Sequence, residues 1–299
     1  MDNSEISLIE ILGIFRDKLS SIFKISFTFS IIIILFFLFQ KDQYTSKAVL
    51  INPAGLNQSS SSMEMLGGLA GLNLGGATDK LSFVQELIKS RSFLAVLSQD
   101  ENFKRDIFAA ESYSKDLKVI NYNSDLYDSK NNLWKIKDND GLPGPTIDSL
   151  YKKYLKSIDV NLDISNDTLT VEVSHVSPNA AYSLLKHIIS SVNSNERERD
   201  LAITSKKVDF LKLEIAKTRE TAVRDSVSKV FQNELANYLI AKNQDDYVVR
   251  SLDPPFLPEK KSYPNMIIIS LLSIFFSFFL TSILLIFKEL YISRSQQYS

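Results

Sequence analysis

Two histidines are the residues of this 299-residue chain with the widest chemical use, and they are isolated from each other in sequence. His175 ends a predicted strand and His187 lies on a predicted helix, so neither has a partner histidine at the spacing of a metal site. The chain contains no cysteine, which excludes disulfides, thiolate ligands and cysteine nucleophiles. We therefore predict no metal site and a structural role for both histidines.

Catalytic motifs are also missing from the sequence. Neither the G-x-S-x-G pattern of serine hydrolases nor the G-x-x-x-x-G-K-[ST] phosphate loop occurs. The 35 acidic residues could include a glycosidase pair, but their spacing identifies none. They are balanced by 34 basic residues, and this balance gives no sign of nucleic-acid binding. We predict a protein that is not an enzyme, with no catalytic residue, no cofactor and no nucleic-acid partner.

Two apolar segments near the ends of the chain predict transmembrane helices; the first includes Lys24 near its start, whose long side chain can reach the headgroups. The first, 22–40, has twelve strongly apolar residues among the fifteen from Ile25 to Phe39, and the second, 266–287, is about 33 Å long as a helix. The first segment has no small-residue cleavage site, so an anchor is favoured over a signal peptide. Residues 1–21 and 288–299 would share one side of the membrane, and 41–265 would lie on the other. The flanking lysines and arginines do not decide which side is which.

Hydroxyl residues recur inside both spans at helical spacing. Those of the second span are three or four positions apart and share one helix face. Such residues permit close helix packing, within the chain or with a neighbouring subunit. Alternatively, each hydroxyl bonds a carbonyl one turn earlier and faces lipid. The predicted packing residues are Ser26, Ser30, Ser270, Ser273, Ser277 and Thr281.

The segment between the spans begins with strand and helix patterns. A strand is predicted from Tyr44 to 52, and a helix over 80–99 that Asp79 caps. Between them, 53–79 is rich in glycine and predicts a mobile loop, or an apolar flap that packs on a neighbouring subunit or the bilayer surface. A short helix over 147–156 precedes a hairpin with one buried face, formed by Ile158, Val160, Leu162 and Ile164 and by Leu169, Val171 and Val173, with a turn at Asn166 and Asp167.

A long helical arm is predicted after the hairpin. Ser177 and Pro178 form a helix start, and neither glycine nor proline follows until Pro254. Because the chain must return to the second span, we expect the helix to reverse near 218–224, giving an antiparallel arm over about 178–244 with a shorter returning helix. The charged run 195–200 predicts a solvated face, or ion pairs with an adjacent subunit. The predicted apolar stripes are Val208, Leu211, Ile215, Thr218 and Ala222, and then Val223, Val227, Val230, Phe231, Leu235 and Tyr238.

A proline-rich segment over 254–264 precedes the second span. Its prolines, Pro254, Pro255, Pro258 and Pro264, predict a stiff extended strut. With the two spans and the strand, helix, hairpin and arm between them, this segment resembles the chain-length determinant family of polysaccharide co-polymerases. Residues 5–12, the residues Glu86, Leu87, Ser90 and Arg91, and Pro178 with Ala180 and Ala181 are similar to that family too.

The resemblance implies an α+β fold of two transmembrane helices flanking a periplasmic α/β base with a helical arm. It implies a bacterial inner-membrane homo-oligomer with cytoplasmic termini, in contact with membrane lipids. Its function would be to regulate the chain length of O-antigen or a related surface polysaccharide, through the polymerase or the growing lipid-linked glycan. Two alternatives stay open: a capsule or exopolysaccharide export component with a separate tyrosine kinase and an outer-membrane channel, and an unrelated two-span scaffold.

Overall fold

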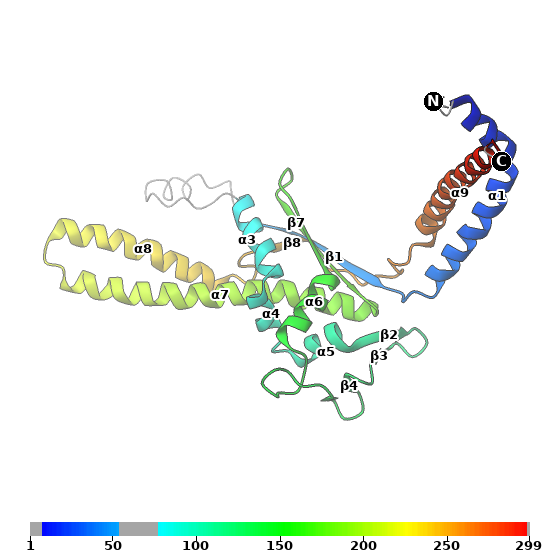
Figure 1. Cartoon of the computed structure of the whole chain (residues 1–299). Coiled ribbons are helices and arrows are strands. Elements are labelled where there is room, and N and C mark those ends of the chain that lie inside the picture. The colour runs from blue at the N-terminus through cyan, green and yellow to red at the C-terminus, as the bar shows by residue number, and fades with distance from the viewer. Residues whose placement is uncertain (1–7, 54–76, 298–299) are drawn as a thin grey trace. The chain divides into compact units, whose positions relative to one another are not determined.

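The chain forms two compact units, seen in the computed structural model of Figure 1. The structure describes residues 8–53 and 77–297. One unit contains the residues up to Asp42 together with those from Lys261 onwards, and the other contains Gln43–Lys260. Most of the glycine-rich segment 53–79, and with it the choice between loop and flap, lies outside the described residues.

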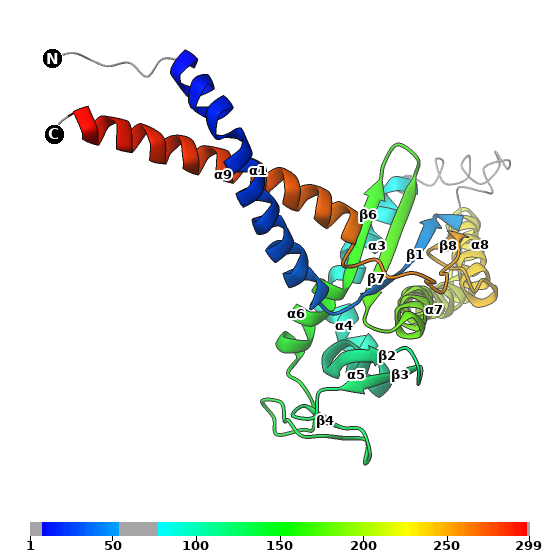
Figure 2. The ribbon, with the colours of Figure 1, turned by 90° about the vertical axis from the view of Figure 1, so that its right-hand side faces the viewer.

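The first unit is a pair of long apolar helices. Helix α1 (Leu8–Leu38) lies against α9 (Met266–Gln297), and both chain ends are at the same end of the pair (Figures 1 and 2). The stretches Leu12–Leu38 and Met266–Ile292 are long and apolar enough to cross a membrane, and most of their residues are exposed, unlike those of a core helix. Both helices extend beyond the predicted segments 22–40 and 266–287, because a helix continues through charged residues that an apolar span excludes.

The second unit is built on an antiparallel sheet with the strand order β6-β7-β1-β8. Its strands are β1 (Tyr44–Ile51), β6 (Ile158–Asp163), β7 (Thr168–His175) and β8 (Arg250–Asp253). Burial alternates along β1 and β7, and the register pairs Ala48 with Val171 and Leu50 with Leu169. The buried side chains of both strands therefore face the same side of the sheet.

Helices cover that buried face, and Figure 2 shows them behind the sheet. They are α3 (Ala77–Lys89), α4 (Arg91–Leu97), α5 (Glu101–Ala109), α6 (Ile147–Ser157) and the first part of α7 (Pro178–Lys217). Two small hairpins follow α5: β2 (Ala110–Ser114) with β3 (Val119–Tyr122), and β4 (Tyr127–Asp128) with β5 (Leu133–Trp134). Helix α5 and these hairpins lie in the stretch 100–145, whose apolar residues follow neither a strand nor a helix period.

The α+β fold class, the strand from Tyr44, the hairpin and the helix beginning at Ile147 are confirmed. The predicted cap at Asp79 is wrong, because α3 begins at Ala77 and includes this residue. The predicted helix 80–99 is also interrupted. At Ser90 the side chain accepts a hydrogen bond from Phe93 N and caps α4. A serine side chain can bond a nearby backbone amide in place of a helical carbonyl, and this ends one helix and begins the next.

The hairpin differs from the prediction at one position. Ile164 is 69% exposed, although the alternation placed it on the buried face. It follows the end of β6, where the carboxylate of Asp163 accepts hydrogen bonds from the amides of Ser165 and Asn166 and bends the chain into the turn. The turn therefore begins two residues earlier than predicted and carries Ile164 out of the sheet.

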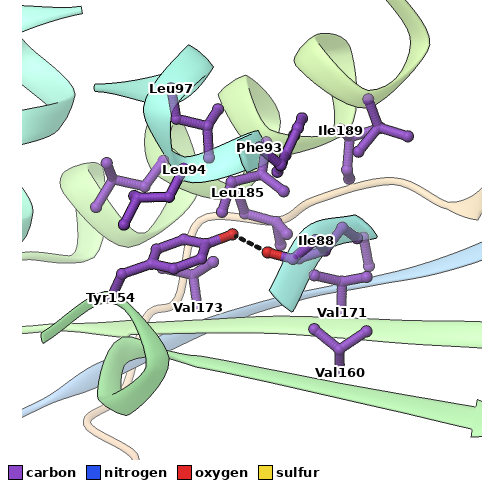
Figure 3. Close-up of a cluster of buried hydrophobic side chains, with 14 of the residues drawn as sticks. Ile88, Phe93, Leu94, Leu97, Tyr154, Val160, Val171, Val173, Leu185 and Ile189 are labelled. Carbon is purple, nitrogen blue, oxygen red and sulfur yellow. Dashed lines mark hydrogen bonds between the residues drawn. The ribbon is translucent and has the colours of Figure 1, made fainter. Parts of the chain in front are cut away.

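The core joins the sheet to the helices around Tyr154 of α6 (Figure 3). The side chain of Tyr154 is fully buried, and its hydroxyl donates to the carbonyl of Ile88 at 2.8 Å. Burial raises the pKa of this phenol, which keeps it a neutral donor. One turn earlier on α6, Tyr151 donates to the carbonyl of Lys89, also at 2.8 Å, from a half-buried position. The two tyrosines therefore tie α6 to the end of α3.

Tyr154→Phe should lower the free energy of unfolding by roughly 1–3 kcal/mol, because the buried carbonyl of Ile88 loses its donor. Tyr151→Phe is the matched control and should cost less, since water can replace the lost hydroxyl. The measurement is urea unfolding of the detergent-solubilised chain, followed by the fluorescence of Trp134, its single tryptophan. Equal losses in the two variants would contradict the role given to burial.

Candidate functional site

Hydroxyl residues line the contact between α1 and α9. Ser30 Oγ and Ser273 Oγ are 2.9 Å apart and form a buried hydrogen bond between the two helices. Ser26, Ser277 and Thr281 are buried in the same contact, and Thr281 also donates to the carbonyl of Ser277. Within the first unit, therefore, these residues pack helix against helix inside one chain. We call this contact the serine seam.

Two of the α9 hydroxyls differ from the rest of the predicted set. Ser270 is only half-buried and donates to the carbonyl of Ile267, as in the alternative of a hydroxyl satisfied within its own helix. The spacing did not indicate Ser282, which is buried and donates to the carbonyl of Phe278. Hydrogen bonding within the helix satisfies a hydroxyl without any partner helix, so spacing alone does not separate the two cases.

Ion pairs close both ends of the helix pair. Lys18 Nζ of α1 is 2.9 Å from Glu289 Oε1 of α9, and Lys261 Nζ is 2.9 Å from Asp42 Oδ1 where the chain leaves the pair. All four side chains are partly exposed, and such pairs contribute about 0–1 kcal/mol each in water. They therefore add to the register of the two helices more than to their stability.

The proline-rich segment 254–264 contains neither helix nor strand. Pro258 and Pro264 are buried, Pro255 is half-buried and Pro254 is exposed. In the second unit, the hydroxyl of Ser46 on β1 donates to the carbonyl of Phe256 at 2.7 Å. The prolines have no backbone amide to donate to a neighbouring strand. The bond from the Ser46 side chain therefore attaches the segment to the sheet without strand pairing.

The arm is the antiparallel pair of α7 and α8 (Thr221–Asn243). Helix α7 ends at Lys217, so the reversal at residues 218–220 falls at the start of the predicted range, and α8 is the shorter helix as expected. The half-buried residues on the facing sides confirm most of the predicted stripes: Val208, Leu211, Ile215 and Thr218 on α7, and Val227, Phe231, Leu235 and Tyr238 on α8.

Three residues of the predicted stripes are exposed instead. Val223 and Val230 are 45% and 50% exposed, and Ala222 is exposed as well. On α8 the positions 227, 231, 235 and 238 occupy the face toward α7, and 230 falls beside it. Position 223 continues the same spacing but lies in the first turn of α8, at the tip of the arm. Ile203, Phe210 and Leu213 of α7 are exposed too, at 46%, 60% and 59%. Both helices of the arm thus leave apolar side chains uncovered within one chain.

A network of charged and polar side chains holds the root of the arm. Glu196 is buried, and its Oε2 is 2.6 Å from Arg199 Nη2. Burial raises the pKa of Glu196, and the charge of Arg199 opposes this effect. Asp200 accepts a hydrogen bond at 2.8 Å from the hydroxyl of Tyr247, which lies beyond the end of α8. The predicted solvated face at 195–200 is therefore wrong for Glu196, because the network lies inside one chain.

Asn193 fixes the same region by backbone contacts. Its Nδ2 donates to the carbonyl of Val249, and its Oδ1 accepts from the amides of Val248 and Val249, at 2.9–3.0 Å. The side chain thus mimics a strand edge and holds the start of β8 against α7. Sequence reasoning missed Asn193, although a signal exists: it interrupts an apolar helical face, beside Ile189 and Val192, where a polar residue needs partners.

The histidines take structural positions. His175 is buried at the end of β7; its Nε2 lies 3.0 Å from the carbonyl oxygen of Asp106, and its Nδ1 accepts from the amide of Ser177 at 3.0 Å. This geometry needs the neutral ring with its proton on Nε2. Burial lowers the pKa of His175, and the bond to Asp106 offsets part of that effect. His187 packs beside Phe103, with ring centres 5.6 Å apart.

Residues that could share chemistry do not converge around the histidines. Among the described residues, no three histidine, aspartate or glutamate side chains are grouped so that they could hold a metal ion. Polar groups of the serine seam and the arm root bond to one another or to the backbone, except Ser277 Oγ, which is buried without a hydrogen-bond partner in the described part of the chain. What the arrangement can do is hold two apolar helices together in the first unit and hold the arm on its base in the second.

A cysteine pair tests the serine seam, since the chain has no cysteine of its own. Oxidised Ser30→Cys/Ser273→Cys should form a disulfide within one chain, because the two hydroxyls are already 2.9 Å apart. The control Phe27→Cys/Phe275→Cys, at positions 68% and 71% exposed, should stay reduced. A maleimide-polymer reagent adds mass to free thiols only. On a non-reducing gel, the disulfide-bonded chain therefore keeps its mass and the reduced chain runs higher. A dimer linked through the first pair would instead place the seam between subunits.

A second test uses the pH dependence of stability. Unfolded His175 binds a proton near its ordinary pKa of about 6.5, whereas the folded chain resists protonation, so the unfolded state binds more protons below that pH. The free energy of unfolding should therefore be full above this pH and fall as the pH drops through it. His175→Gln should flatten this part of the urea-unfolding profile. His187→Gln, the control, should keep it; a flattened control would contradict the assignment.

Comparisons with known proteins give one match to a family profile and several solved structures of low identity. Residues 4–101 match the sequence profile of the Wzz family, described as chain length determinant protein. A comparison with curated proteins gives no match. A full-length bacterial polysaccharide co-polymerase is 13% identical, with 96% of this chain and 99% of that chain covered and a TM-score of 0.36.

Two further solved structures are similar to about three quarters of the chain. A fragment of the polysaccharide co-polymerase WzzB from Salmonella Typhimurium is 13% identical, covers 75% of this chain and 100% of its own, and has a TM-score of 0.29. A mutant of the Shigella flexneri lipopolysaccharide O-antigen chain-length regulator WzzBSF is 11% identical, with 74% and 100% covered and a TM-score of 0.25. The solved structures are too distant to assign a family, so the sequence match carries the comparison. Over residues 4–101 the chain is similar to the Wzz family of chain length determinant proteins.

Proposed function

We propose that this chain regulates the chain length of O-antigen or a related surface polysaccharide, as a homo-oligomer in the bacterial inner membrane. The observation that carries the proposal is the family match over residues 4–101, which include α1 and β1. The solved structures that are similar to the chain are named as polysaccharide co-polymerases and as an O-antigen chain-length regulator. Gln43–Lys260 would lie in the periplasm and both chain ends in the cytoplasm.

The exposed apolar side chains of the arm support the homo-oligomer. Phe210 and Leu213 on α7 and Val230 on α8 are about half exposed or more, on a helix pair too narrow to bury them itself. Apolar surface of this kind is stabilised when a neighbour covers it, at about 25 cal/mol per Å². A neighbouring copy of the arm presents the same faces, so lateral contact between copies accounts for them.

The partners of the oligomer would be the polysaccharide polymerase, the growing lipid-linked glycan, or both. The chain adds no catalytic group to either, so its influence would be geometric: it would hold polymerases together or retain the glycan near them, and thereby raise the local concentration of one for the other. Membrane lipids would surround the helix pair, whose outward-facing side chains are apolar.

Deletion of the gene should abolish the modal length of the surface polysaccharide on a gel and leave the polymer itself in place. Complete loss of surface polymer would instead identify an export component, working with a separate kinase and an outer-membrane channel. Unchanged polymer would identify an unrelated two-span scaffold. Restoration of the modal length by the wild-type gene is the control for each outcome.

Complementation with arm variants tests the oligomer. Phe210→Glu should reduce the mass of the detergent-extracted oligomer and shift the modal length, because it places a charge in the proposed contact between copies. Lys212→Glu, the control, changes an exposed position on another face of the same helix and should keep both properties. Mass photometry and the polysaccharide gel give the two readings. An unchanged oligomer in Phe210→Glu would contradict the lateral contact.

A further inference from the structure

A cavity of about 500 Å³ lies at the root of the arm, between α7 and the chain that returns from α8. One wall is a single face of α7, which carries Tyr182, then Lys186 one turn later and Arg197 about three turns after that. The other wall begins at Asp245 and continues through β8 into the first prolines of the proline-rich segment. We call this cavity the root groove. It lies entirely within the second unit.

The charges that line the root groove cancel. Lys186 and Arg197 are positive, and Asp245 and Asp246 are negative. Arg197 and Asp245 are paired at 2.9 Å across the two walls. A polyanion would meet the two aspartates, and a cation would meet the lysine and the arginine, so the lining disfavours both. It suits a ligand that is uncharged and rich in hydrogen-bonding groups.

Hydrogen-bonding groups in the root groove remain available to such a ligand. Among the described residues, the hydroxyl of Tyr182 and the ammonium of Lys186 have no hydrogen-bond or ion-pair partner. Ser190 and Ser194 donate their hydroxyl protons to carbonyls of α7, which leaves their oxygens free to accept. Along the helical wall, the two donors Tyr182 and Lys186 are therefore followed by the two acceptors Ser190 and Ser194.

Apolar surface completes the root groove. Ile189 lies on the helical wall, and Pro254 and Pro255 face it from the other side. A pyranose ring has a matching character, with hydroxyls around its edge and C–H groups on its faces. The volume lies within the roughly 300–1,000 Å³ that is common for small-ligand sites, which is enough for a short stretch of sugar rings.

We propose that the root groove binds a short uncharged stretch of the polysaccharide whose length the chain regulates. This inference rests on the proposed function and gives it a site: the glycan is held at the base of the arm by Tyr182 and Lys186, against the two prolines. The groove lies between α7 and the segment that follows α8. A bound glycan therefore contacts both segments by which the arm joins its base.

Calorimetric titration of the detergent-solubilised full chain tests this site. The probe is the polysaccharide that mild acid releases, free of lipid, from the lipopolysaccharide of the host strain, and dextran of similar size sets the baseline. Tyr182→Phe/Lys186→Ala should weaken binding at least tenfold, because it removes two donors that the folded chain does not use. The control Tyr238→Phe/Lys242→Ala changes the same residue types at the same four-residue spacing on α8, outside the groove, and should bind as the wild type does.

Two results would overturn the inference: no saturable binding by the wild-type chain above the dextran baseline, or equal binding by the two double variants. Both results differ from a failure of the proposed function, which the gene deletion reports. A lost modal length in the deletion strain, together with no binding in the calorimeter, would retain length control and remove the root groove from it.

Discussion

The pairing of β1 on both of its edges is the interaction on which the rest of the second unit depends. Strand β1 follows α1 directly and pairs with β7 on one side and with β8 on the other. Its inward residues Ser46, Ala48 and Leu50 are fully buried, so a slip of one residue would turn the charged Lys47 into the core. Because β8 leads into the proline-rich segment, the same strand fixes where the chain departs toward α9. The segment that follows α1 and the segment that leads to α9 are thus joined in one sheet.

The arm depends on this sheet through the two halves of α7. From Ala180 to Glu196 one face of the helix is buried against the base, and beyond it the helix contacts mainly α8. The two arm helices interact only modestly. Their facing apolar residues are half-buried, and Lys207 pairs with Glu234 at 3.1 Å. A partly exposed ion pair of this kind adds about 0–1 kcal/mol to stability. The direction of the arm is therefore set at its root, where Asn193 and Tyr247 join the returning chain to α7.

Sequence patterns predicted those parts of the fold that follow a regular period. Alternation in the hairpin, the absence of glycine and proline after Pro178, and the apolar end segments each indicated the element that the structure contains. Residues 100–145 gave no such pattern, since their order comes from single contacts. Trp134, for example, packs against Phe108 and Tyr127 and donates to Glu101, which is distant in sequence. The contacts at the arm root could not be predicted for the same reason. The sequence shows that Glu196 and Tyr247 are polar, but only the fold shows that they bond Arg199 and Asp200.

The serine seam and the exposed arm residues show how the same chain treats two kinds of surface. In a bilayer, two apolar helices gain little from apolar contact, because lipid is as apolar as they are, and association depends on close packing and hydrogen bonds such as that between Ser30 and Ser273. In water, Phe210 and Leu213 gain from any apolar cover. Small hydroxyl residues therefore suit a helix contact in lipid, and large apolar residues suit a contact in water. The chain contains both kinds: the helix pair meets at its hydroxyl residues, whereas the arm leaves apolar side chains exposed within one chain.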